Sequence, residues 1–217
     1  MKSNCAVLWD LDGTLIDSTQ YHLQAWQETV EKEGYSLSRE QFISCFGQRS
    51  ETAVYSYCRQ DLDLFDAQRI VTNKQLRYRE IIRTQGIELV PNAKTLLLEL
   101  KLKGWKQALA TSASAEDVEM ILGVLDLNNH FDTWVSAEAV KESKPNPEVF
   151  LLAANRLKVE PQKCIVVEDS AVGIEAANRA NMKSIGILSS HNTLVANYLV
   201  KNLSEITFNT FEYLINK

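Results

Sequence analysis

The chain of 217 residues contains 45% hydrophobic and 24% charged residues, which is typical of an ordinary globular protein. Its formal net charge of -5 argues against a nucleic-acid or anionic-membrane partner, although a local basic pocket is compatible with that charge. No apolar run approaches the roughly 18 residues that a membrane span needs, and the first residues lead into a short strand without a signal-peptide pattern. We therefore expect a cytoplasmic protein.

The length and the cysteines restrict the architecture further. A chain of 217 residues can form one large domain or a core with a smaller insert. The four cysteines fit no metal-site spacing, and we expect reduced, mostly buried thiols rather than a disulfide framework. They are Cys5, Cys45, Cys58 and Cys164.

The first predicted element is a buried strand over residues 6–9, and two acids follow it directly. Asp10 and Asp12 stand one residue apart, and Gly13 comes next. Open α/β sheets bind their ligands at the carboxyl ends of the strands. Because the burial of two like charges there is costly, the pair predicts a bound cation or a reaction.

The alternative is that both acids only cap a turn before a helix, as aspartate often does. Asp61 and Asp63 have the same spacing but follow Arg59 and Gln60 rather than an apolar strand. We interpret that second pair as a helix start on a solvated surface. The apolar strand before Asp10 is therefore what makes the first pair informative.

A helical pattern occupies residues 17–83, where apolar residues recur at the spacing of helix faces. Gly34 can end the first helix, and Ser38 with Gln41 matches a capping box that would start the second. A glycine loop over residues 46–50 precedes the third helix. This region is therefore predicted to be a helical insert.

From Pro91 onward, helix and strand patterns alternate with short connections. Such alternation predicts right-handed crossovers and a parallel sheet. The expected helices cover residues 92–103, 114–125, 146–157 and 171–181, and the expected strands cover residues 107–110, 133–136, 164–167 and 184–188.

Polar residues lie at or after four of the strand ends. In a parallel sheet all carboxyl ends of the strands lie on one edge, so these groups should meet in one crevice. They are Asp10 with Asp12, Thr111 with Ser112, Lys144 in its loop, and Glu168 with Asp169.

These segments resemble the four sequence motifs of the haloacid dehalogenase superfamily, in the same order and over nearly the whole chain. The motifs are residues 10–14, the hydroxyl pair 111–112, residues 143–147 and residues 167–170. Residues 16–26 are similar to the β-phosphoglucomutase and sugar-phosphate phosphatase branch. The resemblance implies an α/β fold: a Rossmann-like parallel-sheet core, residues 1–16 and 84–217, with an inserted helical-bundle cap domain, residues 17–83.

The resemblance also implies roles for the first two acids. Asp10 would be a nucleophile that forms an aspartyl-phosphate, which divides one difficult displacement into two easier ones. Asp12 would protonate the leaving oxygen and then take a proton from the incoming water or hydroxyl.

Mg²⁺ is the implied cofactor, because a phosphate dianion is repelled by several carboxylates and Mg²⁺ prefers oxygen ligands. The expected metal-binding residues are Asp10, Asp12 through its carbonyl, and Asp169. Glu168 would bind the metal through a water molecule, or would lie behind the residues that bind the metal directly. Glu168 and Asp169 could also cap the helix that follows, a role that is compatible with ligation.

Four residues form the expected phosphate-binding set. Lys144 would spread positive charge over the transferring oxygens. Thr111 would offer a hydroxyl and Ser112 a backbone N–H ahead of a helix N-terminus, and Gly13 belongs to the same set. Without the family pattern, the lysine would be a surface residue and the hydroxyl pair a loop and helix cap.

The insert supplies the expected substrate-specificity residues. Gly47, Gln48 and Arg49 resemble the specificity loop of the family, where Arg49 would pair with a second phosphate or a sugar hydroxyl. A solvated arginine is the alternative. His22 is grouped with them, but it lies one helical turn before Trp26 and could equally be a packed or surface histidine.

Two activities use these motifs, and they differ in whether water or a sugar hydroxyl attacks the aspartyl-phosphate. Ser114 and Ala115 stand where the mutase pattern has a Lys-Asn pair. We therefore predict a Mg²⁺-dependent phosphatase of a small phosphorylated metabolite, such as a sugar phosphate or a phosphoglycolate-like ester. A β-phosphoglucomutase-like phosphomutase is the alternative.

Other functions fit less well. The presence of Asp12 disfavours haloalkanoate dehalogenation and phosphonate cleavage within the family. A non-catalytic protein that binds phosphorylated metabolites has no need for a nucleophile with an acid two residues away. We expect no nucleic-acid or membrane partner, and a monomer is the default expectation, although the sequence carries no information on oligomeric state.

Overall fold

The computed structural model describes residues 4–46, 48–188 and 194–217, and the chain forms two compact units. The first unit consists of Met1–Asp17 and Glu88–Lys217, and the second is Ser18–Ile87. The second unit ends four residues later than the expected boundary at residue 83, because helix α4 (Leu64–Gln85) continues beyond it.

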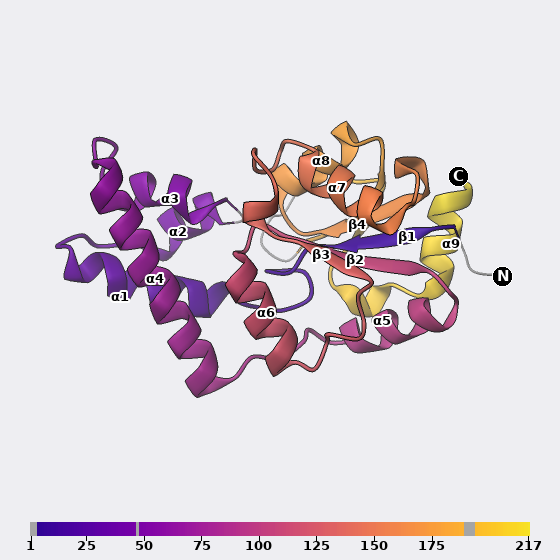
Figure 1. The fold of residues 1–217 in the computed structure, drawn as a ribbon, viewed down its shortest axis with the longest axis horizontal. Coiled ribbons are helices and arrows are strands. Elements are labelled where there is room, and N and C mark those ends of the chain that lie inside the picture. The colour runs from indigo at the N-terminus through magenta and orange to yellow at the C-terminus, as the bar shows by residue number, and fades with distance from the viewer. Residues whose placement is uncertain (1–3, 47, 189–193) are drawn as a thin grey trace. The chain divides into compact units, whose positions relative to one another are not determined.

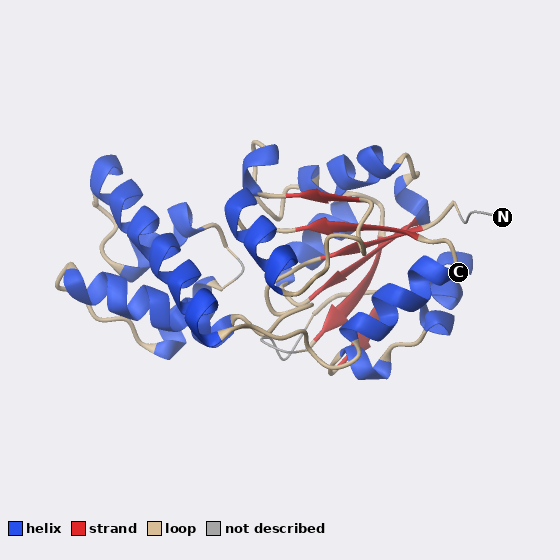
Figure 2. Ribbon diagram, turned by 60° about the horizontal axis from the view of Figure 1, so that its bottom comes forward, coloured by secondary structure: helices blue, strands red, loops and turns tan. Residues whose placement is uncertain are grey.

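A six-stranded parallel sheet forms the centre of the first unit, in the order β3-β2-β1-β4-β5-β6. Figure 2 shows these strands as a single twisted layer. The strands are β1 (Ala6–Trp9), β2 (Lys106–Ala110), β3 (Thr133–Val135), β4 (Cys164–Glu168), β5 (Lys183–Ile187) and β6 (Tyr198–Val200). The predicted α/β fold with a Rossmann-like parallel sheet is confirmed.

Helices cover both faces of this sheet, because both faces of its central strands are apolar. Leu8 packs with residues of α7 and α8 on one face, and Trp9 meets Phe211 of α9 on the other, with ring centroids 6.1 Å apart. Figure 1 shows α7 and α8 on one side and α5 and α9 on the other. The helices of this unit are α5 (Ala93–Leu102), α6 (Ala115–Val124), α7 (Glu148–Leu157), α8 (Ala171–Arg179) and α9 (Phe208–Asn216), with short 3-10 turns at Ala137–Ala139, Pro161–Lys163 and Leu203–Glu205.

One buried polar network joins the strands to the helical layer. The Trp9 indole Nε1 donates to Gln107 Oε1 at 3.1 Å, and Gln107 Nε2 donates to the carbonyl oxygens of Leu97 at 2.8 Å and His130 at 3.4 Å. Gln107 is 1% exposed, so water cannot replace these bonds. The amide therefore satisfies three polar groups at once.

We expect Gln107→Leu to lower the free energy of unfolding by about 1–3 kcal/mol, because the indole N–H and the carbonyl oxygens would lose a buried partner. Urea unfolding followed by tryptophan fluorescence measures this change. Gln162→Leu is the matched control, since Gln162 is exposed and should change stability by less than about 0.5 kcal/mol. Equal stability of both variants would contradict the stabilising role of the Gln107 amide.

The second unit is a helical bundle with a separate apolar core. Its helices are α1 (Thr19–Lys32), α2 (Arg39–Cys45), α3 (Ser50–Tyr57) and α4 (Leu64–Gln85). The predicted capping box is present, with Gln41 N donating to Ser38 Oγ at 3.2 Å and Ser38 N donating to Gln41 Oε1 at 3.0 Å. Asp63 caps α4 by accepting from Asp66 N at 2.9 Å, as the interpretation of the second acid pair expected.

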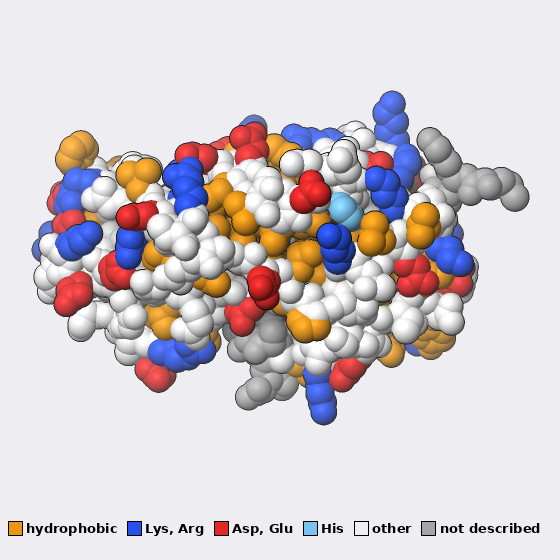
Figure 3. Space-filling model, turned by 90° about the horizontal axis from the view of Figure 1, so that it is seen from below, with side chains coloured by type: hydrophobic (Ala, Val, Ile, Leu, Met, Phe, Trp, Pro, Cys, Tyr) orange, Lys and Arg blue, Asp and Glu red, His pale blue; other side chains and the backbone are white. Residues whose placement is uncertain are grey.

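The distribution of charged side chains on the surface agrees with the modest net charge of the chain. On the face drawn in Figure 3, acidic and basic side chains are interspersed rather than collected in areas of one sign. Across residues 4–46, 48–188 and 194–217, no helix combines the length and apolar character that a membrane crossing requires.

Candidate active site

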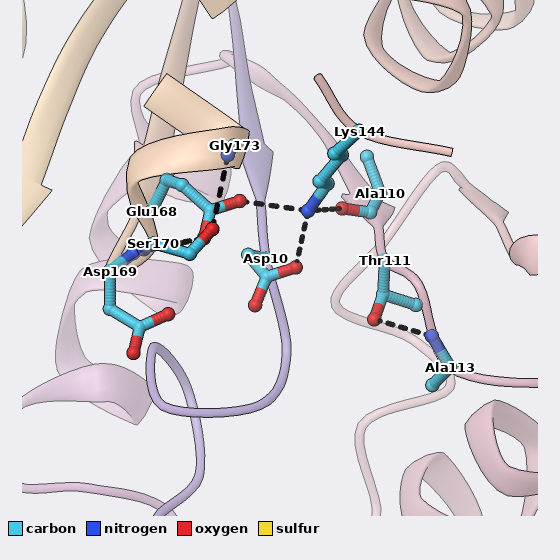
Figure 4. Close-up of polar contacts among 9 residues, drawn as sticks. All are labelled: Asp10, Ala110, Thr111, Ala113, Lys144, Glu168, Asp169, Ser170 and Gly173. Carbon is cyan, nitrogen blue, oxygen red and sulfur yellow. Dashed lines mark hydrogen bonds and ion pairs between the residues drawn. The ribbon is translucent and has the colours of Figure 1, made fainter. Parts of the chain in front are cut away.

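The sheet order brings acids from two neighbouring strands together. Strand β1 pairs with β4, with Trp9 opposite Val167, and Asp10 N donates to the Val167 carbonyl at 3.0 Å. Asp10 therefore lies beside Glu168, the last residue of β4, and Asp169 follows. Figure 4 shows the carboxylates of Asp10 and Glu168 at the amine of Lys144, with the Asp169 carboxylate farther from that amine. The structure thus brings together four of the predicted residues, from three separate segments.

Lys144 is the cation of this cluster. Its Nζ lies 2.6 Å from Asp10 Oδ1, 2.8 Å from Glu168 Oε2 and 3.3 Å from the carbonyl oxygen of Ala110. The side chain is 3% exposed and passes the ring of Phe150 at 5.0 Å. Burial alone would lower the pKa of Lys144, but the charges of Asp10 and Glu168 outweigh burial and raise this pKa above its ordinary value. The amine is therefore a fixed positive charge and not a surface lysine.

The carboxylates outnumber the cation. Burial raises the pKa of Asp10 well above its ordinary value, the charges of Glu168 and Asp169 raise it further, and Lys144 only partly opposes them. One oxygen from each of Asp10, Glu168 and Asp169 lies within 4.8 Å of the others. Such an all-oxygen donor set with excess negative charge fits a small hard dication.

Glu168 has both carboxylate oxygens engaged. Oε1 accepts from the backbone N of Asp169 at 3.0 Å, from Ser170 N at 3.0 Å and from Ser170 Oγ at 2.9 Å, while Oε2 accepts from Lys144. These bonds fix Glu168 as the residue that orients Lys144. Asp10 and Asp169 are the other two carboxylates of the cluster that could hold a cation.

Helix α8 is capped by a residue that the sequence interpretation overlooked. We considered Glu168 and Asp169 as caps, but the cap is Ser170, whose Oγ accepts from Gly173 N at 3.0 Å. The signal was a serine directly before the expected helix start at Ala171. Ser170 thus serves both the helix and Glu168.

Gly173 permits the close approach of Glu168 to α8. A Cβ at this position would lie 2.0 Å from Glu168 Oε2. Alanine is usually the better helix former by about 0.5–1 kcal/mol. Here the overlap would displace Glu168 from Lys144, and overpacking of this kind costs about 1–3 kcal/mol.

We therefore expect Gly173→Ala to lower the free energy of unfolding by about 1–2 kcal/mol, since the overpacking exceeds the helix propensity gained. Gly123→Ala in α6 is the matched control, because no atom of the described residues lies within 4 Å of its added Cβ. The control should gain up to about 1 kcal/mol. Denaturant unfolding of both variants measures the difference, and a stabilised Gly173→Ala would contradict the packing argument.

Gly13 is required for a similar reason near Asp169. Its φ of +84° is unfavourable for other residues, and an added Cβ would lie 2.1 Å from Asp169 Oδ2. Its N donates to the Ile16 carbonyl at 2.8 Å. The glycine therefore closes the turn after β1 and leaves room for the Asp169 carboxylate. Asp12, which precedes it in this turn, is half-buried.

The hydroxyl pair follows β2, the other neighbour of β1. Thr111 is buried, its N donates to the Val135 carbonyl at 3.0 Å, and its Oγ1 accepts from Ala113 N at 3.1 Å. Figure 4 shows this loop beside Lys144, whose amine contacts the carbonyl of Ala110. Ser112 is half-buried in the same loop.

His22 in the second unit is a packed histidine. Its ring stacks on Tyr78, with centroids 4.0 Å apart and an interplanar angle of 5°, and its Nδ1 lies 2.9 Å from Lys74 Nζ. Lys74 is 2% exposed and lies over the rings of Trp26 and Tyr78. The sequence interpretation missed this buried lysine. Its position in the apolar stripe of α4, between Ile70 and Tyr78, was the signal.

Two of the remaining residues that the sequence predicts to set specificity lie at the start of α3. Gln48 is exposed, and its N donates to the Cys45 carbonyl at 3.1 Å. Arg49 is half-buried and occupies the position before the first residue of the helix. Gly47 lies outside the described residues.

Comparison with known proteins agrees with this geometry. The sequence profile of the family described as haloacid dehalogenase-like hydrolase matches residues 7–187. The fructose-1-phosphate phosphatase YqaB of Escherichia coli is 31% identical over 188 residues, which cover 83% of this chain and 95% of that protein. The beta-phosphoglucomutase of Bacillus subtilis is 28% identical over 208 residues, which cover 93% and 91% of the two chains.

A solved structure supports the same relationship. The crystal structure of beta-phosphoglucomutase from Clostridium difficile matches with a TM-score of 0.86 and 28% identity, covering 97% of this chain and 96% of that one. The chain belongs to the haloacid dehalogenase-like hydrolases, in the branch that resembles β-phosphoglucomutase and the sugar phosphatases. The prediction of a haloacid dehalogenase-type enzyme is confirmed.

Proposed function

We propose that the chain is a Mg²⁺-dependent phosphatase that hydrolyses a small phosphorylated metabolite, a sugar phosphate or a phosphoglycolate-like ester, through an aspartyl-phosphate. The observation that carries the proposal is the contact of Lys144 Nζ with Asp10 Oδ1 at 2.6 Å, beside the carboxylates of Glu168 and Asp169. A phosphoryl group bound against Asp10 would meet a nucleophile, a fixed cation and a cation-binding acid pair together.

In the first half of the proposed reaction, a carboxylate oxygen of Asp10 attacks phosphorus and the ester oxygen leaves. Asp12 donates a proton to that oxygen. Lys144 neutralises charge on the phosphoryl oxygens, and Glu168 holds the lysine in place. Thr111 and Ser112 bind the phosphoryl group from the loop after β2, with Gly13 in the facing turn.

In the second half, Asp12 takes a proton from water, which attacks phosphorus and releases Asp10 and inorganic phosphate. Mg²⁺ would be held by Asp10, Asp169 and the Asp12 carbonyl, where it would offset the repulsion between the phosphate dianion and the acids. The raised pKa of Asp10 is consistent with a requirement for Mg²⁺, because an added dication favours the ionised carboxylate that attacks.

The second unit is proposed to act as a cap that selects the substrate. The proposed substrate-specificity residues of this cap are Gln48, Arg49 and Gly47. His22 is packed against Tyr78 and Lys74, so its proposed part is to orient these neighbours. Ser114 and Ala115 favour the phosphatase over the mutase, and the names of the relatives, which include both activities, keep the mutase as the alternative.

A substrate panel tests the proposal. The protein is incubated with p-nitrophenyl phosphate, fructose 1-phosphate, phosphoglycolate and β-glucose 1-phosphate, with Mg²⁺ or with a chelator, and both phosphate and isomerised sugar are measured. We expect Mg²⁺-dependent release of phosphate. No turnover of any ester would favour a binding protein, and glucose 6-phosphate formed without phosphate would establish the mutase. Size-exclusion chromatography with light scattering tests the expectation that the protein is a monomer.

A further inference from the structure

The loop between β2 and α6, residues 111–114, carries Thr111 and Ser112 and is joined to the end of strand β3. Thr111 N donates to the Val135 carbonyl at 3.0 Å, and Ala137 N donates to the Ala113 carbonyl at 2.9 Å. These two main-chain bonds fix the first part of the loop. Neither bond involves Ala115, the first residue of α6, which directly follows the loop.

Glu138 supplies a connection to Ala115. Its Oε2 accepts from Ala115 N at 3.0 Å and from Ser136 Oγ at 2.8 Å. Ser136 is buried at 2% exposure, so its hydroxyl is a rigid donor that aims the Glu138 carboxylate. Ala115 is the first residue of α6, where a negative charge also complements the partial positive charge of the helix end.

The loop has two tasks that depend on its exact path. It carries Thr111 and Ser112, and the carbonyl of Ala110 just before it accepts from Lys144 at 3.3 Å. Groups that bind a ligand are effective only when they are held in the right geometry. A side chain that holds the far end of this loop therefore affects how the phosphoryl group is bound.

We propose that Glu138 is a positioning residue for phosphate, acting through the Ala115 backbone and not by contact with the substrate. The proposal rests on the proposed phosphatase function for the identity of the ligand. Loss of Glu138 should weaken binding of the phosphoryl group in the ground state and the transition state alike. Such a loss raises KM and leaves kcat nearly unchanged.

The test uses Glu138→Ala, Glu138→Gln and the control Glu119→Ala in the full-length protein. Glu119 is an exposed acid on α6, four residues beyond Ala115. The amide oxygen in the Glu138→Gln variant can still accept from Ala115 N and Ser136 Oγ, because neither bond requires a charged acceptor. Inorganic phosphate binding is measured by calorimetry with Mg²⁺, kcat and KM with p-nitrophenyl phosphate, and backbone exchange of residues 111–115 by hydrogen–deuterium exchange.

For Glu138→Ala we expect about tenfold weaker phosphate binding and a KM raised about tenfold, with kcat within about threefold of the native value. Exchange at Ala115 should be faster. Glu138→Gln and Glu119→Ala should stay within about twofold of the native protein in both constants. The rescue by glutamine distinguishes a positioning role from a general loss of stability.

Two results would overturn the proposal: unchanged phosphate affinity and KM in Glu138→Ala, or a Glu138→Gln variant as impaired as Glu138→Ala. Failure of the proposed function would look different, because the native protein would then release no phosphate from any ester. In that case, an unchanged rate of hydrogen exchange at Ala115 in Glu138→Ala would also show that Glu138 does not hold the Ala115 backbone.

Discussion

Asp10→Asn is expected to reduce turnover of phosphate esters by about 10⁴-fold or more, the usual consequence of removing a covalent nucleophile. Asparagine keeps the shape of the side chain, and its amide oxygen can still accept from Lys144. It cannot attack phosphorus as a carboxylate does. Steady-state release of phosphate with Mg²⁺ measures the effect, and residual turnover above about 1% would exclude the covalent mechanism.

The fold of Asp10→Asn should remain intact. The raised pKa of Asp10 shows that its ionised form is disfavoured by burial and by Glu168 and Asp169. The native state therefore binds more protons than the unfolded state above about pH 3.9, and this carboxyl costs stability as the pH rises. A neutral asparagine removes that cost, so unfolding at pH 7 in chelator should need at least as much urea as in the native protein.

Asp61→Asn is the matched control for both measurements, because the Asp61 side chain is 84% exposed. It should change neither turnover nor stability. An Asp10→Asn variant that unfolds more readily than this control would show that the lost turnover reflects a damaged fold.

Lys144→Met is the second large effect that we expect. Removing one partner of a buried ion pair costs about 3–5 kcal/mol, because Asp10 and Glu168 would be left facing each other without a cation. We also expect kcat to fall by about 10³-fold, since the fixed charge on the phosphoryl oxygens is lost. Urea unfolding in chelator and phosphate release with Mg²⁺ measure the two changes.

The pH dependence of Lys144→Met follows from the same charges. Without the lysine, the pKa of Asp10 should rise further, so the destabilisation is present at pH 7 and is lost as the pH falls toward the ordinary value of about 3.9. A smaller deficit at pH 5 than at pH 7 is therefore expected. A deficit that grows on acidification would contradict this origin.

Two further variants separate charge from packing. Lys141→Met removes an exposed lysine three residues before Lys144 and should have little effect. The double variant Asp10→Asn with Lys144→Met should be more stable than Lys144→Met alone, because it leaves one buried carboxylate fewer without a partner. Additive losses would mean that the two side chains do not interact.

Local patterns in the sequence were sufficient to predict the central strands, the capping box at Ser38, the helix start after the second acid pair, and the acids after β1. The prediction stopped at residue 188, so β6 and α9 were missed. Strand β6 has only three residues, too few for a reliable alternation. Helix α9 did carry a signal, since Phe208, Phe211 and Leu214 recur at helical spacing and are buried.

The sequence by itself determined which charged residues stand at the strand ends, because strand length, glycine turns and helix caps are local properties. Only the tertiary structure decided how those charges are paired. Lys144 and Asp10 are 134 positions apart, and their contact depends on the order β2-β1-β4 within the sheet. The distinct role of Glu168 likewise follows from bonds to Lys144 and Ser170, which exist only after the chain has folded.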